Sequence, residues 1–74
     1  MSRFRDELVT QLAALRPYAN KLAGQDSEDL LQDAALKALA HEASYNDDAK
    51  MGAWLRTIAR NTHLEQVRRA KFVA

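Results

Sequence analysis

Apolar residues in the first third of the chain recur at steps of three and four, the spacing of an amphipathic α-helix. They predict a helix over residues 4–23 whose apolar stripe consists of Phe4, Leu8, Leu12, Leu15, Ala19 and Leu22. We expect this helix to end at Gly24. Pro17 lies inside the pattern, where it removes a backbone donor and crowds the preceding turn. A kink or a restart of the helix is therefore expected near Arg16.

A second helix is predicted over residues 27–42. Asp26 or Ser27 can cap its first turn with a side-chain oxygen, and the acidic residues that follow complement the positive end of the helix dipole. The residues expected to face the core are Leu31, Ala34, Ala35, Ala38 and Leu39. The opposite face carries Asp29, Gln32, Asp33 and Leu36. From spacing alone, that face is either a solvated surface with one leucine or a binding surface.

A loop over residues 43–47 is predicted next, because its Ser, Asn and Asp side chains compete for backbone hydrogen bonds. Tyr45 is its only aromatic residue. The ring can anchor the loop to the core, or it can serve as a platform for an unstacked base.

The third helix is predicted over residues 48–69, with Met51, Trp54, Leu55, Ile58 and Thr62 on its buried face. We interpret Trp54 as a core residue. Two neighbouring rows on the outer side hold Arg56, Arg60, His63, Val67 and Lys71, and then Thr57, Asn61, Leu64 and Arg68. Arg and Lys neutralise phosphates and Asn can pair with a base edge, although such a face also suits solvent or an acidic partner.

Length and composition predict one all-α domain, a bundle of three helices, or of four if Pro17 interrupts the first. The chain has 74 residues and no cysteine, so helix packing has to stabilise it without disulfides or thiolate metal sites. No stretch approaches the roughly 20 apolar residues that span a bilayer. We therefore expect a cytoplasmic protein that does not bind membranes.

Charge is unevenly distributed. Residues 1–50 hold six Lys or Arg against nine Asp or Glu, a balance of −3, whereas residues 51–74 hold five against one, a balance of +4. This asymmetry is compatible with nucleic-acid binding by the last helix and with a basic protein partner at the acidic part.

Three segments of the chain, in this order and at this spacing, form a specific pattern. They are Leu15-Arg16-Pro17-Tyr18-Ala19-Asn20-Lys21-Leu22-Ala23-Gly24, then Glu28-Asp29-Leu30-Leu31-Gln32-Asp33, and finally Ala53-Trp54-Leu55-Arg56-Thr57-Ile58-Ala59-Arg60-Asn61. The chain resembles, over roughly residues 8–70, region 2 of the extracytoplasmic-function (ECF) sigma factors, promoter-specificity subunits of bacterial RNA polymerase. Its opening is similar to the alphaproteobacterial general-stress branch.

This resemblance implies two binding surfaces. The acidic face, with Asp29, Gln32, Asp33 and Leu36, would dock on the β′ clamp helices of RNA polymerase. The loop would capture a base flipped out of the non-template strand of the promoter −10 element, and the last helix would hold that strand. The residues implied in DNA binding are Lys37, Tyr45, Asn46, Arg56, Arg60, Asn61 and Arg68, with Lys71 as a further phosphate contact.

Two departures from the family pattern argue against strong DNA binding more than against the fold. Ala34-Ala35 stands where the family has a bulky residue, and Asp47 and Asp48 lie close to the expected path of the phosphates. The chain also stops before the linker and the helix-turn-helix region 4, so we expect an isolated region 2 domain.

Alternative functions follow from the same residues. One is a sigma-like interaction module that binds an anti-sigma factor without reading DNA, and an anti-sigma factor is also an expected partner of a true reader. An enzyme is not expected, because the chain lacks a Gly-rich phosphate loop and its histidines, His41 and His63, have no carboxylate at metal-ligand spacing. No cofactor or metal is predicted.

Overall fold

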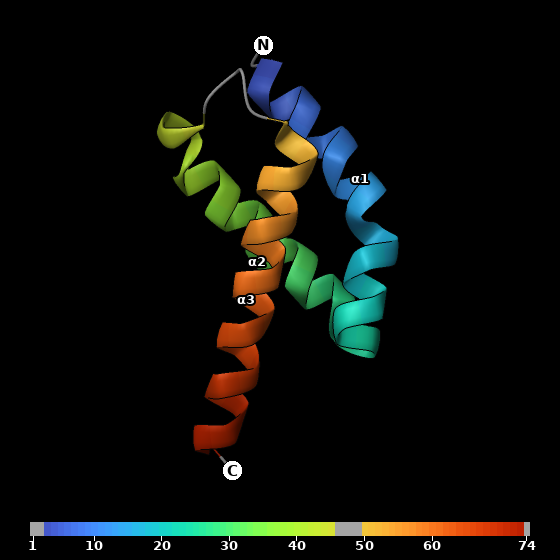
Figure 1. Ribbon diagram of the computed structural model, residues 1–74, viewed down its shortest axis with the longest axis vertical. Coiled ribbons are helices and arrows are strands. Elements are labelled where there is room, and N and C mark those ends of the chain that lie inside the picture. Colours follow the sequence, from blue (N-terminus) through green and yellow to red (C-terminus); the bar gives the residue numbers. More distant parts are fainter. Residues whose placement is uncertain (1–2, 46–49, 74) are drawn as a thin grey trace.

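The computed structural model describes residues 3–45 and 50–73, and these residues form an all-α bundle, as predicted (Figure 1). Helix α1 spans Arg3–Ala23, α2 spans Ser27–Ala40 and α3 spans Met51–Val73. Short 3₁₀ turns at Gly24–Asp26 and Glu42–Ser44 follow α1 and α2. Figure 1 shows the second half of α3 extending beyond the other two helices.

Helix α1 passes through Pro17 without restarting, so the bundle has three long helices and the four-helix variant is wrong. The reason is the position of the proline on the outside of the helix. Pro17 and Ala13, whose carbonyl loses its intrahelical donor, are both exposed, so water can satisfy that oxygen. Figure 1 shows the axis of α1 curving along its length.

Gly24 ends α1, as predicted, in a left-handed conformation with φ of +56°. Glycine adopts this conformation without the penalty that a Cβ brings. Helix α2 begins at Ser27, but the expected side-chain cap is absent: Asp26 makes no capping hydrogen bond. The 3₁₀ turn replaces it, since the Ser27 amide donates to the carbonyl of Gly24.

The other helix boundaries differ slightly from the prediction. Helix α2 ends two residues earlier than expected, at Ala40, and its last turn closes through hydrogen bonds from the His41 amide to the carbonyls of Lys37 and Ala38. Residues 48–49 of the predicted third helix lie outside the described residues, and Lys50, also predicted in that helix, precedes α3, which begins at Met51. Helix α3 continues past residue 69 to Val73 because Arg, Lys and Ala favour helix even without burial.

The core lies between all three helices. Its buried apolar residues are Leu8, Leu15, Ala19, Leu30, Leu31, Ala34, Ala38, Met51, Leu55 and Ala59. The stripe predicted for α1 is confirmed, with Phe4, Leu12 and Leu22 packed against this core at its edges. On α3, Ala59 is an unpredicted member, and Trp54 packs against the core as expected.

The side of α2 that faces the core is rotated about the helix axis relative to the predicted one. Leu30 is completely buried although it was not expected in the core, whereas Leu39, which was expected there, is 40% exposed. These two residues lie on opposite edges of the helix, nine positions apart. Because α2 contacts both α1 and α3, its buried arc is displaced toward Leu30.

Two leucines of α2 test this core assignment. Leu30→Ala should lower the free energy of unfolding by about 2–5 kcal/mol, since it empties a fully buried site. Leu36→Ala, at a site that is 62% exposed, should change it by less than about 0.5 kcal/mol. Urea denaturation followed by circular dichroism measures both, and equal midpoints for the two variants would contradict the assignment.

Candidate functional site

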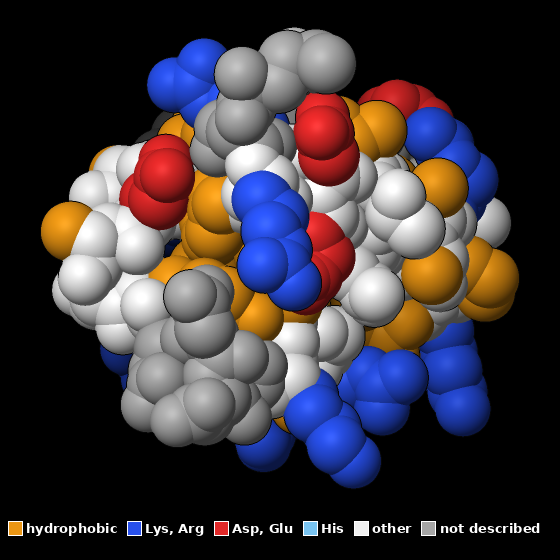
Figure 2. All heavy atoms as spheres, turned by 90° about the horizontal axis from the view of Figure 1, so that it is seen from above, with side chains coloured by type: hydrophobic (Ala, Val, Ile, Leu, Met, Phe, Trp, Pro, Cys, Tyr) orange, Lys and Arg blue, Asp and Glu red, His pale blue; other side chains and the backbone are white. Residues whose placement is uncertain are grey.

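The outer side of α3 presents a row of polar and basic side chains to solvent. Thr57, Asn61, Leu64 and Arg68 follow each other at steps of four, three and four, and all four are exposed. Arg60 and Lys71 lie beside this row and are also exposed. Figure 2 views the whole domain from above. Several Lys and Arg side chains project along the lower edge of this view, and the visible Asp and Glu side chains lie farther from that edge.

Arg56 lies at the contact between α3 and α1. Its guanidinium carbon is 5.1 Å from the centroid of the Tyr18 ring, a cation–π arrangement. Arg56 remains exposed, so the contact orients the guanidinium without removing it from solvent.

Three aromatic rings join α1, α3 and the segment after α2. Tyr45 lies 5.4 Å from Phe4 and 4.9 Å from Trp54, measured between ring centroids, and Phe4 lies 5.9 Å from Trp54. Tyr45 is half-buried. The ring therefore anchors this segment to the bundle, and a base could stack only on the part of it that stays accessible.

A polar contact joins α2 to α3 at Lys37. The Nζ of Lys37 donates to Oε2 of Glu65 at 2.5 Å. The hydrogen bond and the charge of Lys37 lower the pKa of the Glu65 carboxyl below its ordinary value of 4.5, and Arg69 and Arg68 add to this effect. Lys37 is thus held by a carboxylate of the last helix.

A second polar contact joins the same two helices one turn earlier on α2. The Nε2 of Gln66 donates to Oδ2 of Asp33 at 2.7 Å, in a partly buried position. Asp33 is therefore turned toward α3, whereas Asp29, Gln32 and Leu36 are exposed on the outer face of α2.

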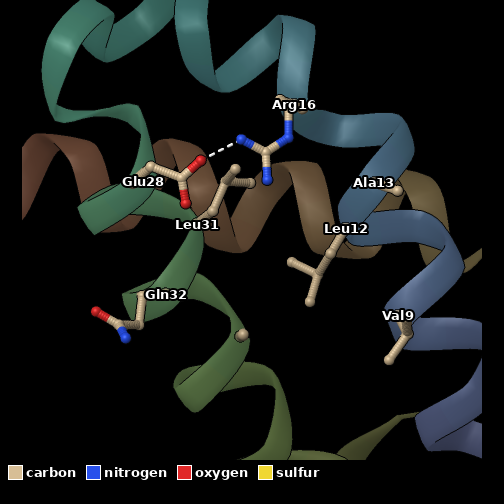
Figure 3. Close-up of a pocket in the computed structure, with 8 residues that line it drawn as sticks. Val9, Leu12, Ala13, Arg16, Glu28, Leu31 and Gln32 are labelled. Atoms are coloured by element: carbon tan, nitrogen blue, oxygen red, sulfur yellow. Dashed lines mark hydrogen bonds and ion pairs between the residues drawn. The ribbon is translucent and has the colours of Figure 1, made fainter.

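An open groove lies between α1 and α2 (Figure 3). Leu12 of α1 and Leu31 of α2 point toward each other across it, and an ion pair between Arg16 and Glu28 bridges the two helices. Val9 lies in its wall and is 68% exposed. The groove offers apolar surface beside the acidic outer face of α2.

The described part of the chain contains no group of three His, Cys, Asp or Glu side chains that could hold a metal ion. Nor is any helix in it long and apolar enough to cross a membrane.

Comparison with known proteins shows to which family the chain belongs. The sequence model of sigma-70 region 2 matches residues 8–73. The chain belongs to the sigma-70 region 2 family. The three helices and the polar faces described above are therefore those of a region 2 domain.

Relatives of this region 2 domain are ECF RNA polymerase sigma factors. EcfG of Rhodopseudomonas palustris is 33% identical over 69 residues, covering 90% of this chain and 38% of that protein. In Mycobacterium tuberculosis, SigM is 43% identical over 47 residues (64% of this chain, 24% of SigM) and SigL is 38% identical over 63 residues (81% and 36%). The chain spans less than two fifths of the length of each of these relatives. No solved structure matches it at a significant level.

The structure brings some of the site residues predicted for region 2 together on one exposed side and leaves others in contact with side chains of the domain itself. Arg60, Asn61 and Arg68 share the exposed side of α3. Lys37, Arg56 and Tyr45 are each engaged by another side chain of the domain, namely Glu65, Tyr18 and the Phe4–Trp54 pair. Asn46 lies outside the described residues. Their binding roles stay predictions.

Sequence reasoning missed Glu65 and Gln66, which hold Lys37 and Asp33. Their contacts join residues 28 and 33 positions apart, so no pattern within one helix reveals them. One signal was present: Glu65 is the single acidic residue among residues 51–74.

The Lys37–Glu65 pair makes a prediction about pH. The pKa of Glu65 is lower in the folded domain than in the unfolded chain, so the stabilisation by the pair is present above pH 4.5 and is lost as the pH falls through the folded value. In Lys37→Gln, the midpoint of the Glu65 titration, followed by NMR of its carboxyl carbon, should move up toward the ordinary value. Lys50→Gln removes an equal charge elsewhere and should leave this midpoint unchanged. Equal midpoints in the parent and Lys37→Gln would refute the pair.

Proposed function

We propose that this region 2 domain serves transcription initiation by docking on RNA polymerase through α2 and by reading and holding the non-template strand of the promoter −10 element on α3. The observation that supports this most is the separation of two exposed surfaces on adjacent helices. One carries Asp29, Gln32 and Leu36 on α2, and the other carries Arg60, Asn61 and Arg68 on α3. Membership of the sigma-70 region 2 family supports the assignment of these partners to the two surfaces.

The strand-binding face would combine two kinds of contact. Arg60, Arg68 and Lys71 would neutralise phosphates, which adds affinity that is independent of sequence and falls as salt rises. Asn61, in the same exposed region, can donate to and accept from a base edge, so it would contribute sequence preference.

Base capture would couple recognition to melting. A base exposes its pairing edge only after it leaves the stack, which costs a few kcal/mol. Stacking on an aromatic side chain returns about 1–3 kcal/mol of that cost. In this proposal Tyr45, with Asn46 beside it in sequence, receives the flipped base. The contacts of Tyr45 with Phe4 and Trp54 would hold the ring in place before the base arrives.

The docking face would bind the β′ clamp helices of the polymerase. Asp29 offers a carboxylate to a basic partner, and Gln32 offers an amide. Leu36, 62% exposed in the free domain, would lose its contact with water on docking. The partly buried Asp33, oriented by Gln66, would form the edge of this surface next to α3.

The domain would act by binding alone, without a chemical reaction, a cofactor or a metal. It would work in the bacterial cytoplasm, where the polymerase and the promoter are found. An anti-sigma factor would be a further partner of the free domain, because the groove between α1 and α2 leaves apolar residues such as Val9 accessible.

Strand reading predicts distinct effects for Asn61 and Arg60. Asn61→Ala should weaken binding of a −10-like single-stranded oligonucleotide by about tenfold, because it removes a base contact, and should leave a scrambled oligonucleotide unaffected. Arg60→Ala should weaken both oligonucleotides alike and should reduce the slope of log affinity against log salt by about 0.7, because it removes a phosphate contact. Fluorescence anisotropy at several salt concentrations measures these effects.

Asn20→Ala is the matched control for Asn61, because Asn20 is an exposed asparagine on α1. It should bind like the parent. If the parent itself binds −10-like and scrambled strands equally, the domain does not read sequence, and an interaction module that binds an anti-sigma factor becomes the better description.

Polymerase docking predicts a difference between two exposed leucines on different helices. Leu36→Ala should weaken binding to a β′ clamp-helix coiled coil by about fivefold, because the side chain would be buried in the interface. Leu64→Ala removes a leucine of α3 that is 44% exposed, and it should leave this affinity unchanged. Calorimetric titration with the isolated coiled coil measures both affinities, and equal losses in the two variants would rule out docking by the outer face of α2.

A further inference from the structure

Glu65 carries a negative charge in a basic segment of the chain. It is the single acidic residue among residues 51–74, which hold five Lys or Arg. It also lies within the proposed strand-binding side of α3, four residues after Asn61 and three before Arg68, so the three side chains emerge on one side of the helix. A carboxylate at this position repels the phosphates of any strand that follows α3.

The carboxylate is directed at one particular cation. Its Oε2 accepts a hydrogen bond from Nζ of Lys37 at 2.5 Å, although α3 also carries Arg68 and Arg69 nearby. Lys37 lies on α2, and its side chain is 37% exposed while that of Glu65 is 53% exposed. Both groups are therefore within reach of a phosphate from solvent, and the ammonium can pair with the carboxylate or with the phosphate.

We propose that Glu65 is a built-in brake on sequence-independent strand binding: its carboxylate occupies the Lys37 ammonium and keeps a backbone phosphate from pairing with it. This inference rests on the proposed function, since it concerns the same strand-binding surface. A strand that binds at Lys37 must first displace Glu65 and then pass beside the released carboxylate.

The brake acts on phosphate contacts and leaves base contacts alone. Glu65 reduces the affinity for every strand by the same factor, so it does not alter the ratio of affinities for −10-like and scrambled sequences. It lowers the fraction of the free domain that is held on arbitrary single strands. Base capture and polymerase docking then supply a larger share of the total binding energy.

Glu65→Gln tests the brake. It should tighten binding of −10-like and scrambled single-stranded oligonucleotides by the same factor, about two- to fivefold, as expected for the release of one exposed ion pair. The slope of log affinity against log salt should steepen by about 0.7, the value for one additional phosphate contact with a single strand. Circular dichroism verifies that the helical fold is retained.

Two comparisons separate the brake from a general charge effect. Glu7→Gln changes the net charge by the same amount at an exposed position on α1 and should tighten binding less than Glu65→Gln does. In a Lys37→Gln background, the gain from Glu65→Gln should be smaller than in the parent, because no ammonium is left to release. An equal gain in Glu7→Gln, or a gain that is undiminished in the Lys37→Gln background, overturns the proposal.

A measurement without nucleic acid keeps this inference distinct from the proposed function. Inorganic tripolyphosphate is titrated into the parent and into Glu65→Gln while NMR follows the Nζ group of Lys37. The brake predicts that this signal responds at a lower tripolyphosphate concentration in Glu65→Gln, and equal responses overturn it. If no variant binds oligonucleotides but this difference is present, the strand-reading function fails and the competition at Lys37 stands.

Discussion

Close approach of the helices at alanine is the constraint on which the rest of this domain depends. Ala19 of α1, Ala34 and Ala38 of α2, and Ala59 of α3 have no exposed surface, so they lie where the helices pack against each other. Small side chains at such contacts let helix axes approach more closely than leucines allow. This packing determines which faces of α2 and α3 remain outside, and the two polar surfaces of the domain are those remaining faces.

The contact between α2 and α3 changes character along its length. Alanine and leucine fill its centre, whereas Lys37–Glu65 and Asp33–Gln66 form polar contacts beside it. The consecutive residues Glu65 and Gln66 thus hold two side chains of α2, Lys37 and Asp33. Polar contacts near the surface add little stability, but they orient the side chains that take part in them. The proposed strand-binding and docking surfaces would meet at this part of the structure.

The sequence predicted the fold well because the apolar periods of α1 and α3 are regular, and Gly24 marks a real break between helices. The prediction of which side of α2 faces the core was less accurate. Its many alanines give the apolar pattern a weak direction, and contact with two neighbouring helices displaced the buried arc, which exchanged Leu30 for Leu39. For the site, the sequence indicated exposed residues such as Asn61 but not the partners of Lys37, Arg56 and Tyr45, because those contacts exist only after the helices have assembled.

The row of exposed side chains on α3, from Thr57 to Arg68, has a length that follows from helix geometry. From Thr57 to Arg68 it covers eleven residue steps, which corresponds to about 16 Å at the α-helical rise of 1.5 Å per residue. A strand with bases spaced by about 3.4 Å would place about five nucleotides along that distance. In the proposed function, the length of this row would therefore limit how many nucleotides of a strand one copy of the domain contacts, whichever side chains make the contacts.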